Sequence, residues 1–163
     1  MKYSIDTISN TNFLEFGDFI NPYDKKAEDI NTNTTKSYFD LANIEILGED
    51  KKARLNLFEE KKRTFPLTID MLEKHPFSSQ VFLPLNNNPF FVIVCPPSVK
   101  PDLNNLNIFK VENGNGVNFK PMVWHFPLIS INDAKFITID KKIADSNLEI
   151  YNFTEEEKFH FNG

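Results

Sequence analysis

The sequence predicts a single domain over residues 1–163 that is mainly β, a sandwich or barrel with a few short helices. The length fits one domain, and a chain of this size buries enough surface to form a core of its own. Many short apolar or alternating runs are separated by turns rich in proline, glycine and asparagine, which is typical of all-β domains. Patterns with helical spacing are brief, so helices are expected only as minor elements.

The first part of the chain is expected to hold a short helix, a long loop and two strands. Asn12 can cap a helix that Gly17 would end. Residues 21–36 are polar and are expected to form a surface loop. Residues 39–46 alternate weakly and residues 54–59 more clearly, so each is expected to be a strand.

The middle of the chain combines helix and strand signals. Asp70 and Glu73 form a capping-box pattern, which predicts a short helix that ends before the following proline. Strands over residues 81–83 and 89–95 are expected to pair as a hairpin around the turn at residues 86–88. The second of these strands is apolar on both faces, so we expect both faces to be buried.

The last part of the chain returns to strands. Residues 102–109 have helical spacing, and residues 113–118 form a turn cluster that favours positive φ. Thr154 begins a second capping-box pattern, which predicts a short final helix. Strands are expected over residues 123–129, 135–140 and 148–151.

Charge and cysteine content exclude several classes of partner and compartment. The formal net charge is −5 and there is no basic cluster, so nucleic-acid binding is not expected. No apolar run is long enough to span a membrane, and the N-terminus lacks the apolar region of a signal peptide. Cys95 is the single cysteine and cannot form an internal disulfide, so we expect a cytoplasmic protein.

Two of the three histidines are candidates for chemistry. His75 lies where the predicted helix ends, and His125 lies among large apolar residues. Each could instead be a neutral histidine whose hydrogen bonds are satisfied in the core. Two such histidines in one small barrel favour function, because histidine is the usual side chain for proton transfer near neutral pH. His160 is expected to be exposed.

A metal site is an alternative use of the same residues. Catalytic metal sites usually take three protein ligands, and the sequence has no His-x-His or His-Glu-x-x-His pattern. A third ligand would have to be Glu73, Gln80 or a distant carboxylate, so we expect no metal and no cofactor. Cys95 lies in an apolar strand, where a thiol is expected to be inert.

Several blocks of sequence resemble one family. Residues 72–85 read Leu-Glu-Lys-His-Pro-Phe-Ser-Ser-Gln-Val-Phe-Leu-Pro-Leu, and residues 114–118 read Gly-Asn-Gly-Val-Asn. With Trp-His at residues 124–125, these blocks resemble the ureidoglycolate lyase family, also called ureidoglycolate hydrolase, in order and spacing. The family implies a cupin-type β-barrel, usually a homodimer, that splits ureidoglycolate into glyoxylate and urea during allantoin breakdown.

The chain departs from the family pattern where catalysis is expected. Lys120 stands where the family has a histidine, and Pro121 stands where it has an arginine. Phe126 replaces the second histidine of a pair, and Lys141 replaces another arginine. Either the two lysines substitute as cations or the substrate has changed.

The resulting hypothesis assigns a role to each candidate side chain. Proton transfer is expected at His75 and His125. The substrate carboxylate is expected at Lys120 or Arg54. Urea recognition and the rest of the substrate site are assigned to polar, cationic and aromatic side chains: Ser79, Gln80, Asn118, Trp124 and Lys141. The alternatives are a metal-dependent cupin enzyme that acts on another small acid and a non-catalytic barrel that binds one.

Overall fold

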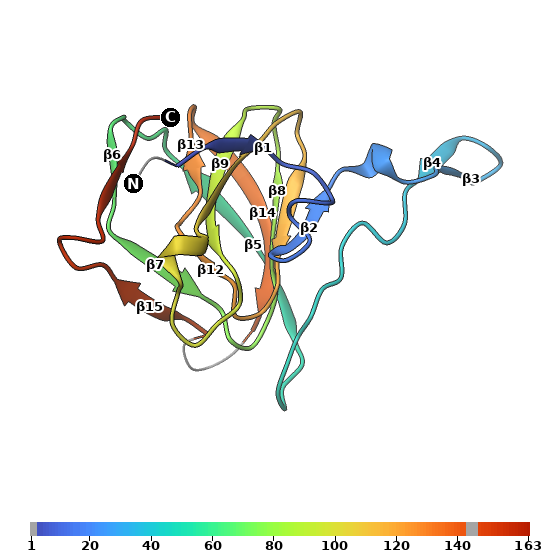
Figure 1. Ribbon diagram of the computed structural model, residues 1–163. Coiled ribbons are helices and arrows are strands. Elements are labelled where there is room, and N and C mark those ends of the chain that lie inside the picture. The colour runs from blue at the N-terminus through green and yellow to red at the C-terminus, as the bar shows by residue number, and fades with distance from the viewer. Residues whose placement is uncertain (1–2, 143–146) are drawn as a thin grey trace.

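The computed structural model describes residues 3–142 and 147–163, and most of its ordered elements are strands (Figure 1). In this part of the chain the helical elements are the 3-10 turns η1 (Pro22–Asp24) and η2 (Leu103–Asn105). No helix of the described residues is long and apolar enough to cross a membrane. The prediction of a mainly β fold is therefore confirmed.

Two sheets make up the body of the molecule. The larger sheet consists, in spatial order, of β1 (Ile5–Thr7), β10 (Asn107–Val111), β9 (Phe90–Cys95), β12 (Trp124–His125), β7 (Met71–Lys74) and β15 (Glu149–Asn152), with β13 (Ile129–Ser130) also beside β9. The smaller sheet consists of β2 (Gly17–Ile20), β11 (Gly116–Phe119), β8 (Gln80–Pro84), β14 (Ala134–Lys141) and β5 (Ala53–Glu60).

Two smaller pairings complete the fold. β6 (Leu67–Ile69) pairs with β16 (Phe159–Phe161), and β3 (Glu28–Ile30) pairs with β4 (Thr35–Ser37). The β3–β4 hairpin projects away from both sheets and is largely exposed (Figure 1). The surface loop predicted for residues 21–36 is thus exposed but contains a hairpin.

β9 is buried on both faces, as its apolar sequence predicted. Phe90, Val92 and Val94 belong to a cluster that also takes in Phe82 and Phe136 from the smaller sheet. This cluster is the core between the two sheets. The alternate side chains of β9 point the other way, into a second cluster beneath β6 and β16, which includes Phe91, Ile93, Cys95 and Phe161.

The predicted hairpin between residues 81–83 and 89–95 is wrong. β8 pairs with β11 and β14, whereas β9 pairs with β10, β12 and β13. The turn at residues 86–88 therefore carries the chain from one sheet to the other. A short asparagine-rich turn between two apolar runs fits both connections, and packing of the two sheets decides between them.

The four predicted helices are also wrong. The capping-box segment that starts at Asp70 is β7, which pairs with β12 and β15. Residues 12–16 form turns before β2, residues 102–109 contain only η2 before β10, and Thr154 begins a turn. In that last turn Glu157 still accepts a hydrogen bond from the Thr154 N–H, so the capping contact forms without a helix.

The later strand predictions are mostly confirmed. β5, β14 and β15 lie where residues 54–59, 135–140 and 148–151 predicted strands. The run 123–129 is divided into β12 and β13, and the run 39–46 contributes only a bridge from Ile46 to Ser78. We call residues 43–47 the strap, because they lie along the segment 77–79 through backbone hydrogen bonds.

Candidate functional site

Three polar side chains from the larger sheet meet on the face that looks toward the smaller sheet. Glu73 lies on β7, and His75 follows the last residue of that strand. His125 on β12 is the registered partner of Glu73 and of Val94, a core residue between the sheets. The pairing of β7 with β12 therefore brings the three side chains together.

The three groups lie within contact distance of one another. The imidazole rings of His75 and His125 are 5.4 Å apart between centroids. The Nε2 atom of His125 lies 3.6 Å from Oε1 of Glu73. One ligand atom from each of the three residues lies within 4.8 Å of the others. The His125 ring also stacks on Phe119 at 4.5 Å, which fixes its orientation.

Backbone carbonyls determine which nitrogen of each histidine carries the proton. Nδ1 of His125 lies 3.1 Å from the carbonyl oxygen of Val123, and Nδ1 of His75 contacts that of Asn147. A carbonyl only accepts, so each Nδ1–H donates and each Nε2 keeps its lone pair. Neither Nε2 has a hydrogen-bond partner among the described residues, although both atoms are buried.

Asn147 holds His75 and was not predicted as a functional residue. Its Oδ1 accepts from the Phe77 N–H at 2.8 Å, and its Nδ2 donates to Ser78 Oγ at 2.9 Å. These bonds attach Asn147 to the chain just after His75, and its own carbonyl then receives the His75 Nδ1–H. Asn147 lies 72 residues further along the chain, so local sequence patterns carry no signal of this contact.

Burial shifts the protonation of the cluster. Burial, followed by the charge of His75, lowers the pKa of His125 to about 3, so His125 is neutral at physiological pH. Burial raises the pKa of the Glu73 carboxyl, while His75 acts in the opposite direction. The cluster thus places a neutral imidazole beside a carboxyl group that holds its proton to a higher pH than usual.

A cavity of about 440 Å³ gives access to this cluster. Glu73 and Gln80 line it, together with Phe82 and Phe136 of the smaller sheet and Arg63 beyond β5. Oε1 of Gln80 is buried and has no hydrogen-bond partner in the described part of the chain. The cavity wall therefore presents the Glu73 carboxyl group and an amide oxygen that no described residue contacts by a hydrogen bond.

The same groups have the chemistry of a ligand set for a divalent transition metal ion. A neutral histidine binds a metal ion through one ring nitrogen, while the N–H of its other ring nitrogen donates to a carbonyl. Both histidines are arranged in this way, with Nδ1 as the donor and Nε2 left for the metal. Glu73 supplies a carboxylate oxygen close to both. Glu73 was one of the third ligands considered from the sequence, so the residues fit such an ion.

Cys95 takes no part in the site. Its side chain is fully buried in the layer beneath β6 and β16. Burial raises the pKa of its thiol to about 12, which leaves it protonated and unreactive at neutral pH. The expectation of an inert cysteine is confirmed.

Of the nine predicted site residues, His75, His125 and Gln80 lie in or beside this cavity. Trp124 precedes His125 and so points to the opposite face of the sheet, where its Nε1 donates to the Ser98 carbonyl at 3.2 Å. Asn118 is buried on the outer face of the smaller sheet, where its Nδ2 donates to Asp18 and to the Asn43 carbonyl. Ser79 Oγ accepts from the Glu45 N–H of the strap at 2.9 Å.

The predicted cations are engaged elsewhere. Lys120 donates to the Leu14 carbonyl at 2.6 Å, and Lys141 donates to the Leu47 carbonyl. Arg54 forms a two-point contact with Asp140, with distances of 2.6 and 3.0 Å. None of these three lines the 440 Å³ cavity. The cation that does line it is Arg63, which the sequence did not single out.

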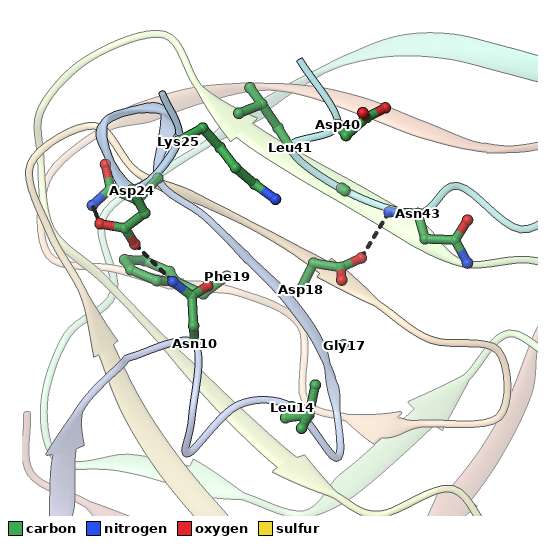
Figure 2. A pocket seen from close by; sticks show the side chains of 12 residues that line it. Asn10, Leu14, Gly17, Asp18, Phe19, Asp24, Lys25, Asp40, Leu41 and Asn43 are labelled. Carbon is green, nitrogen blue, oxygen red and sulfur yellow. Dashed lines mark hydrogen bonds between the residues drawn. The ribbon is translucent and has the colours of Figure 1, made fainter. Parts of the chain in front are cut away.

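A second cavity, of about 430 Å³, lies between β2 and the chain that leads into the strap (Figure 2). Its polar groups bind one another: Asp18 accepts from the Asn43 N–H at 2.9 Å, and Asn10 donates to Asp24 at 2.8 Å. Figure 2 shows these two contacts on opposite sides of the cavity. It holds neither histidine of the cluster.

Comparison with known proteins identifies close sequence relatives. A family profile described as ureidoglycolate lyase matches residues 2–160. A ureidoglycolate lyase of Azotobacter vinelandii is 34% identical over 156 residues, which cover 95% of this chain and 94% of that protein. A ureidoglycolate lyase of Burkholderia mallei is 36% identical over 153 residues, covering 93% of this chain and 89% of the relative.

Among solved structures the similarity is weaker. The TDP-fucose-3,4-ketoisomerase WlaRA of Campylobacter jejuni superposes with a TM-score of 0.42 at 11% identity, over 83% of this chain and 84% of that one. A dTDP sugar isomerase of Desulfovibrio desulfuricans gives a TM-score of 0.39, also at 11% identity, over 84% and 81%.

Proposed function

The chain belongs to the ureidoglycolate lyase family, and from this we infer that it is an enzyme that cleaves ureidoglycolate into glyoxylate and urea. The observation that carries the assignment to a site is the cluster of Glu73, His75 and His125. The Glu73 carboxyl group lines a cavity, and the two buried Nε2 atoms beside it have no hydrogen-bond partner among the described residues. Such a cluster suits a reaction that consists of proton transfers.

The reaction requires one base and one acid. The hydroxyl group on the central carbon must lose its proton, so that its oxygen can form the carbonyl of glyoxylate. The bond from this carbon to the urea nitrogen then breaks, and the nitrogen keeps the electron pair and takes up a proton. In our proposal His75 Nε2 accepts the hydroxyl proton, and protonated Glu73 donates to the nitrogen.

The cluster stabilises the charges that these steps create. The reaction leaves an imidazolium at His75 and a carboxylate at Glu73, and the two charges attract each other. A proton passed from His75 to Glu73 after product release restores the starting state. His125 stays neutral and lies against the Glu73 carboxyl group, with 3.6 Å between its Nε2 and Oε1. One well-placed acid or base contributes about 10²–10⁴ in rate.

Gln80 is suited to recognise the urea group. Urea offers both N–H donors and a carbonyl acceptor, and a primary amide side chain complements both. The Gln80 Oε1 atom is buried without a partner among the described residues, at the cavity that Glu73 also lines. A substrate N–H donated to this oxygen would satisfy it.

A metal-dependent form of the enzyme is the second candidate, because the same three residues fit a divalent ion. Glu73, His75 and His125 would hold the ion through one oxygen and two Nε2 atoms. Such an ion supplies Lewis acidity toward the oxygens of the substrate. The residues of the cavity wall would bind and orient the substrate in either form.

The deciding experiment is product release from freshly prepared ureidoglycolate, with and without a chelator. Equal amounts of glyoxylate and urea that persist in the chelator support the metal-free lyase. Activity that is lost in the chelator and restored by a divalent ion supports the metal-dependent form. Ammonia in place of urea would mean amide hydrolysis, and no turnover by folded protein would refute the proposed activity.

We further propose that the enzyme is a cytoplasmic homodimer that acts in purine catabolism. The free, buried Cys95 thiol is in keeping with a reducing compartment. An apolar surface on β5 and β14 supports association of two copies.

A further inference from the structure

We propose that Arg63 holds the carboxylate of the substrate and so determines the preference of the enzyme for an anionic substrate. The inference rests on the proposed function, since it concerns the acid that this cavity would take. It replaces the expectation that the carboxylate lies at Lys120 or Arg54, both of which are bound to other groups.

The position of Arg63 fits this role. It lines the same cavity as Glu73 and Gln80, and it is the one lysine or arginine that does so among the described residues. Its backbone N–H donates to the Ser130 carbonyl at 2.9 Å, which anchors the residue to β13 of the larger sheet. The guanidinium side chain is 40% exposed, so it is open to the cavity and to solvent.

The guanidinium has capacity to bind a further anion. Its ion-pair partner is Glu60, with 3.7 Å between Nε and Oε1, which is longer than a hydrogen bond. The other oxygen of Glu60 accepts from Ser130 Oγ at 2.6 Å. The planar guanidinium has five N–H donors in a fork that matches both oxygens of a carboxylate.

The negative groups of the cavity wall are partly neutralised, which favours an anion next to Arg63. Glu59 forms an ion pair with Lys135 at 2.5 Å. Burial raises the pKa of the Glu60 carboxyl, while Ser130 and Arg63 act in the opposite direction. Among the described residues Arg63 is the cation of this wall.

The arrangement separates binding from chemistry within one cavity. The carboxylate group is an unreacting part of ureidoglycolate and is held alike in the ground state and the transition state. Loss of such contacts raises KM and leaves kcat nearly unchanged. A catalytic role for Arg63 would instead lower kcat.

The test compares Arg63→Gln, Arg63→Lys and the control Lys61→Gln. Lys61 is highly exposed and pairs with Asp133, so its substitution removes the same charge without altering the cavity. We expect Arg63→Gln to raise KM for ureidoglycolate about 10- to 100-fold, from the loss of a charge-assisted contact, with kcat changed less than about threefold. The KM of Arg63→Lys should lie between those of the unchanged protein and Arg63→Gln, because lysine keeps the charge and lacks the forked donors of the guanidinium.

Product inhibition identifies the group that Arg63 binds. In Arg63→Gln the inhibition constant of glyoxylate should rise in parallel with KM. The inhibition constant of urea, which is uncharged, should not change. Equal inhibition by glyoxylate in Arg63→Gln and the unchanged protein would overturn the proposal.

Calorimetric binding of glyoxylate separates this inference from the proposed activity. If the unchanged protein has no lyase activity yet binds glyoxylate, and Arg63→Gln does not, the proposed function fails and the role of Arg63 stands. If the unchanged protein does not bind glyoxylate at all, the role of Arg63 is refuted as well.

Discussion

Two backbone carbonyls determine the chemistry of the histidine pair. The carbonyl oxygens of Val123 and Asn147 accept the Nδ1 protons, which leaves a lone pair on each Nε2. Without these acceptors either nitrogen could carry the proton. Single-residue changes at the cluster should therefore alter proton transfer more than they alter the fold.

Replacement of Glu73 by glutamine tests the acid of the proposed reaction. The amide has nearly the same shape and cannot donate an acidic proton, so kcat should fall by about 10²–10⁴. The variant should keep its far-ultraviolet circular dichroism and its melting temperature within a few degrees. Glu28→Gln, on the exposed β3 strand, makes the same carboxyl-to-amide change away from the cavity and should retain full activity. A loss of less than tenfold in Glu73→Gln would exclude Glu73 as the acid.

The protonation of His125 should make the fold sensitive to acid. In the unfolded chain a histidine takes up a proton near its ordinary pKa of 6.5, whereas folding lowers the pKa of His125 to about 3. Between these values the unfolded state binds more protons, so stability rises with pH and is lost as pH falls from about 6.5 toward 3. The raised pKa of Glu73 acts in the opposite direction, from its ordinary value of 4.5 upward, so the two effects overlap in pH.

Urea denaturation between pH 4 and 7 measures this effect. The free energy of unfolding of the unchanged protein should fall more steeply toward pH 4 than that of His125→Asn, which has no titrating ring. Parallel curves for the two proteins would contradict the lowered pKa of His125.

At the residue scale the sequence indicated the two histidines and Gln80, because their types and context are unusual beside apolar strands. It did not indicate Arg63 or Asn147. Asn147 acts through a backbone carbonyl, and any residue at that position supplies one. Arg63 gains its role from Ser130, which lies far along the sequence, through contacts that only the folded chain makes.

At the scale of elements, β7 shows how tertiary pairing overrides a local signal. The residues Asp70 and Glu73 match a capping box, yet a helix there would lose the pairing with both β12 and β15. The strand presents Glu73 and His75 on one face and Leu72 and Lys74 on the other. Local propensity could not anticipate this, because the partners of β7 lie far along the chain.

Lys74 secures the outer face of β7 and is only 1% exposed. Its ammonium group donates to the carbonyls of Ser98 and Val99 at 3.0 Å each, and lies 4.4 Å from the centre of the Trp124 ring. It also pairs with Glu149 at 3.1 Å. A buried lysine with these partners connects β7, β15 and the loop after β9.

Replacement of Lys74 by methionine should destabilise the protein by about 2–3 kcal/mol, because hydrogen bonds to a charged donor are lost and two carbonyls lose their partner. Glu149→Gln, at a more exposed position, should cost less than about 1 kcal/mol. Both values can be measured by equilibrium unfolding in urea. Equal effects of the two substitutions would show that the ion pair, and not the carbonyl contacts, holds the ammonium group.

At the scale of the whole molecule, the outer face of the smaller sheet is incompletely covered. β5 is an edge strand of this sheet, and Leu55 and Leu57 are 68% and 53% exposed. Their registered partners Ile139 and Ile137 on β14 extend the apolar surface. A free edge next to exposed leucines is suited to pairing with a second copy of the chain.

Leu55→Lys should therefore shift a homodimer toward the monomer. The added charge would be buried between two copies, while in the monomer it would remain in solvent. Light scattering coupled to gel filtration reports the mass of each species. A dimer of unchanged mass and affinity in Leu55→Lys would place the interface elsewhere. A monomeric unchanged protein would refute the homodimer itself.

The fold class was predictable from the spacing of apolar runs and turns, whereas the arrangement of the sheets was not. The turn at residues 86–88 joins strands that look like a hairpin, but the two strands belong to different sheets. Their separation depends on the packing of Phe82, Phe90 and Phe136 across the core, and such contacts leave no periodic trace in the sequence.

The division of the cavity wall between the two sheets has an evolutionary consequence. In our proposal the proton-transferring groups are Glu73 on β7 and His75 directly after it, in the larger sheet, whereas the guanidinium of Arg63 comes from the chain after β5, a strand of the smaller sheet. Mutations in that segment can change which acid is accepted while the reaction machinery is inherited intact. Descendants of such a protein could acquire new substrates through drift in one segment, long before the histidine pair is altered.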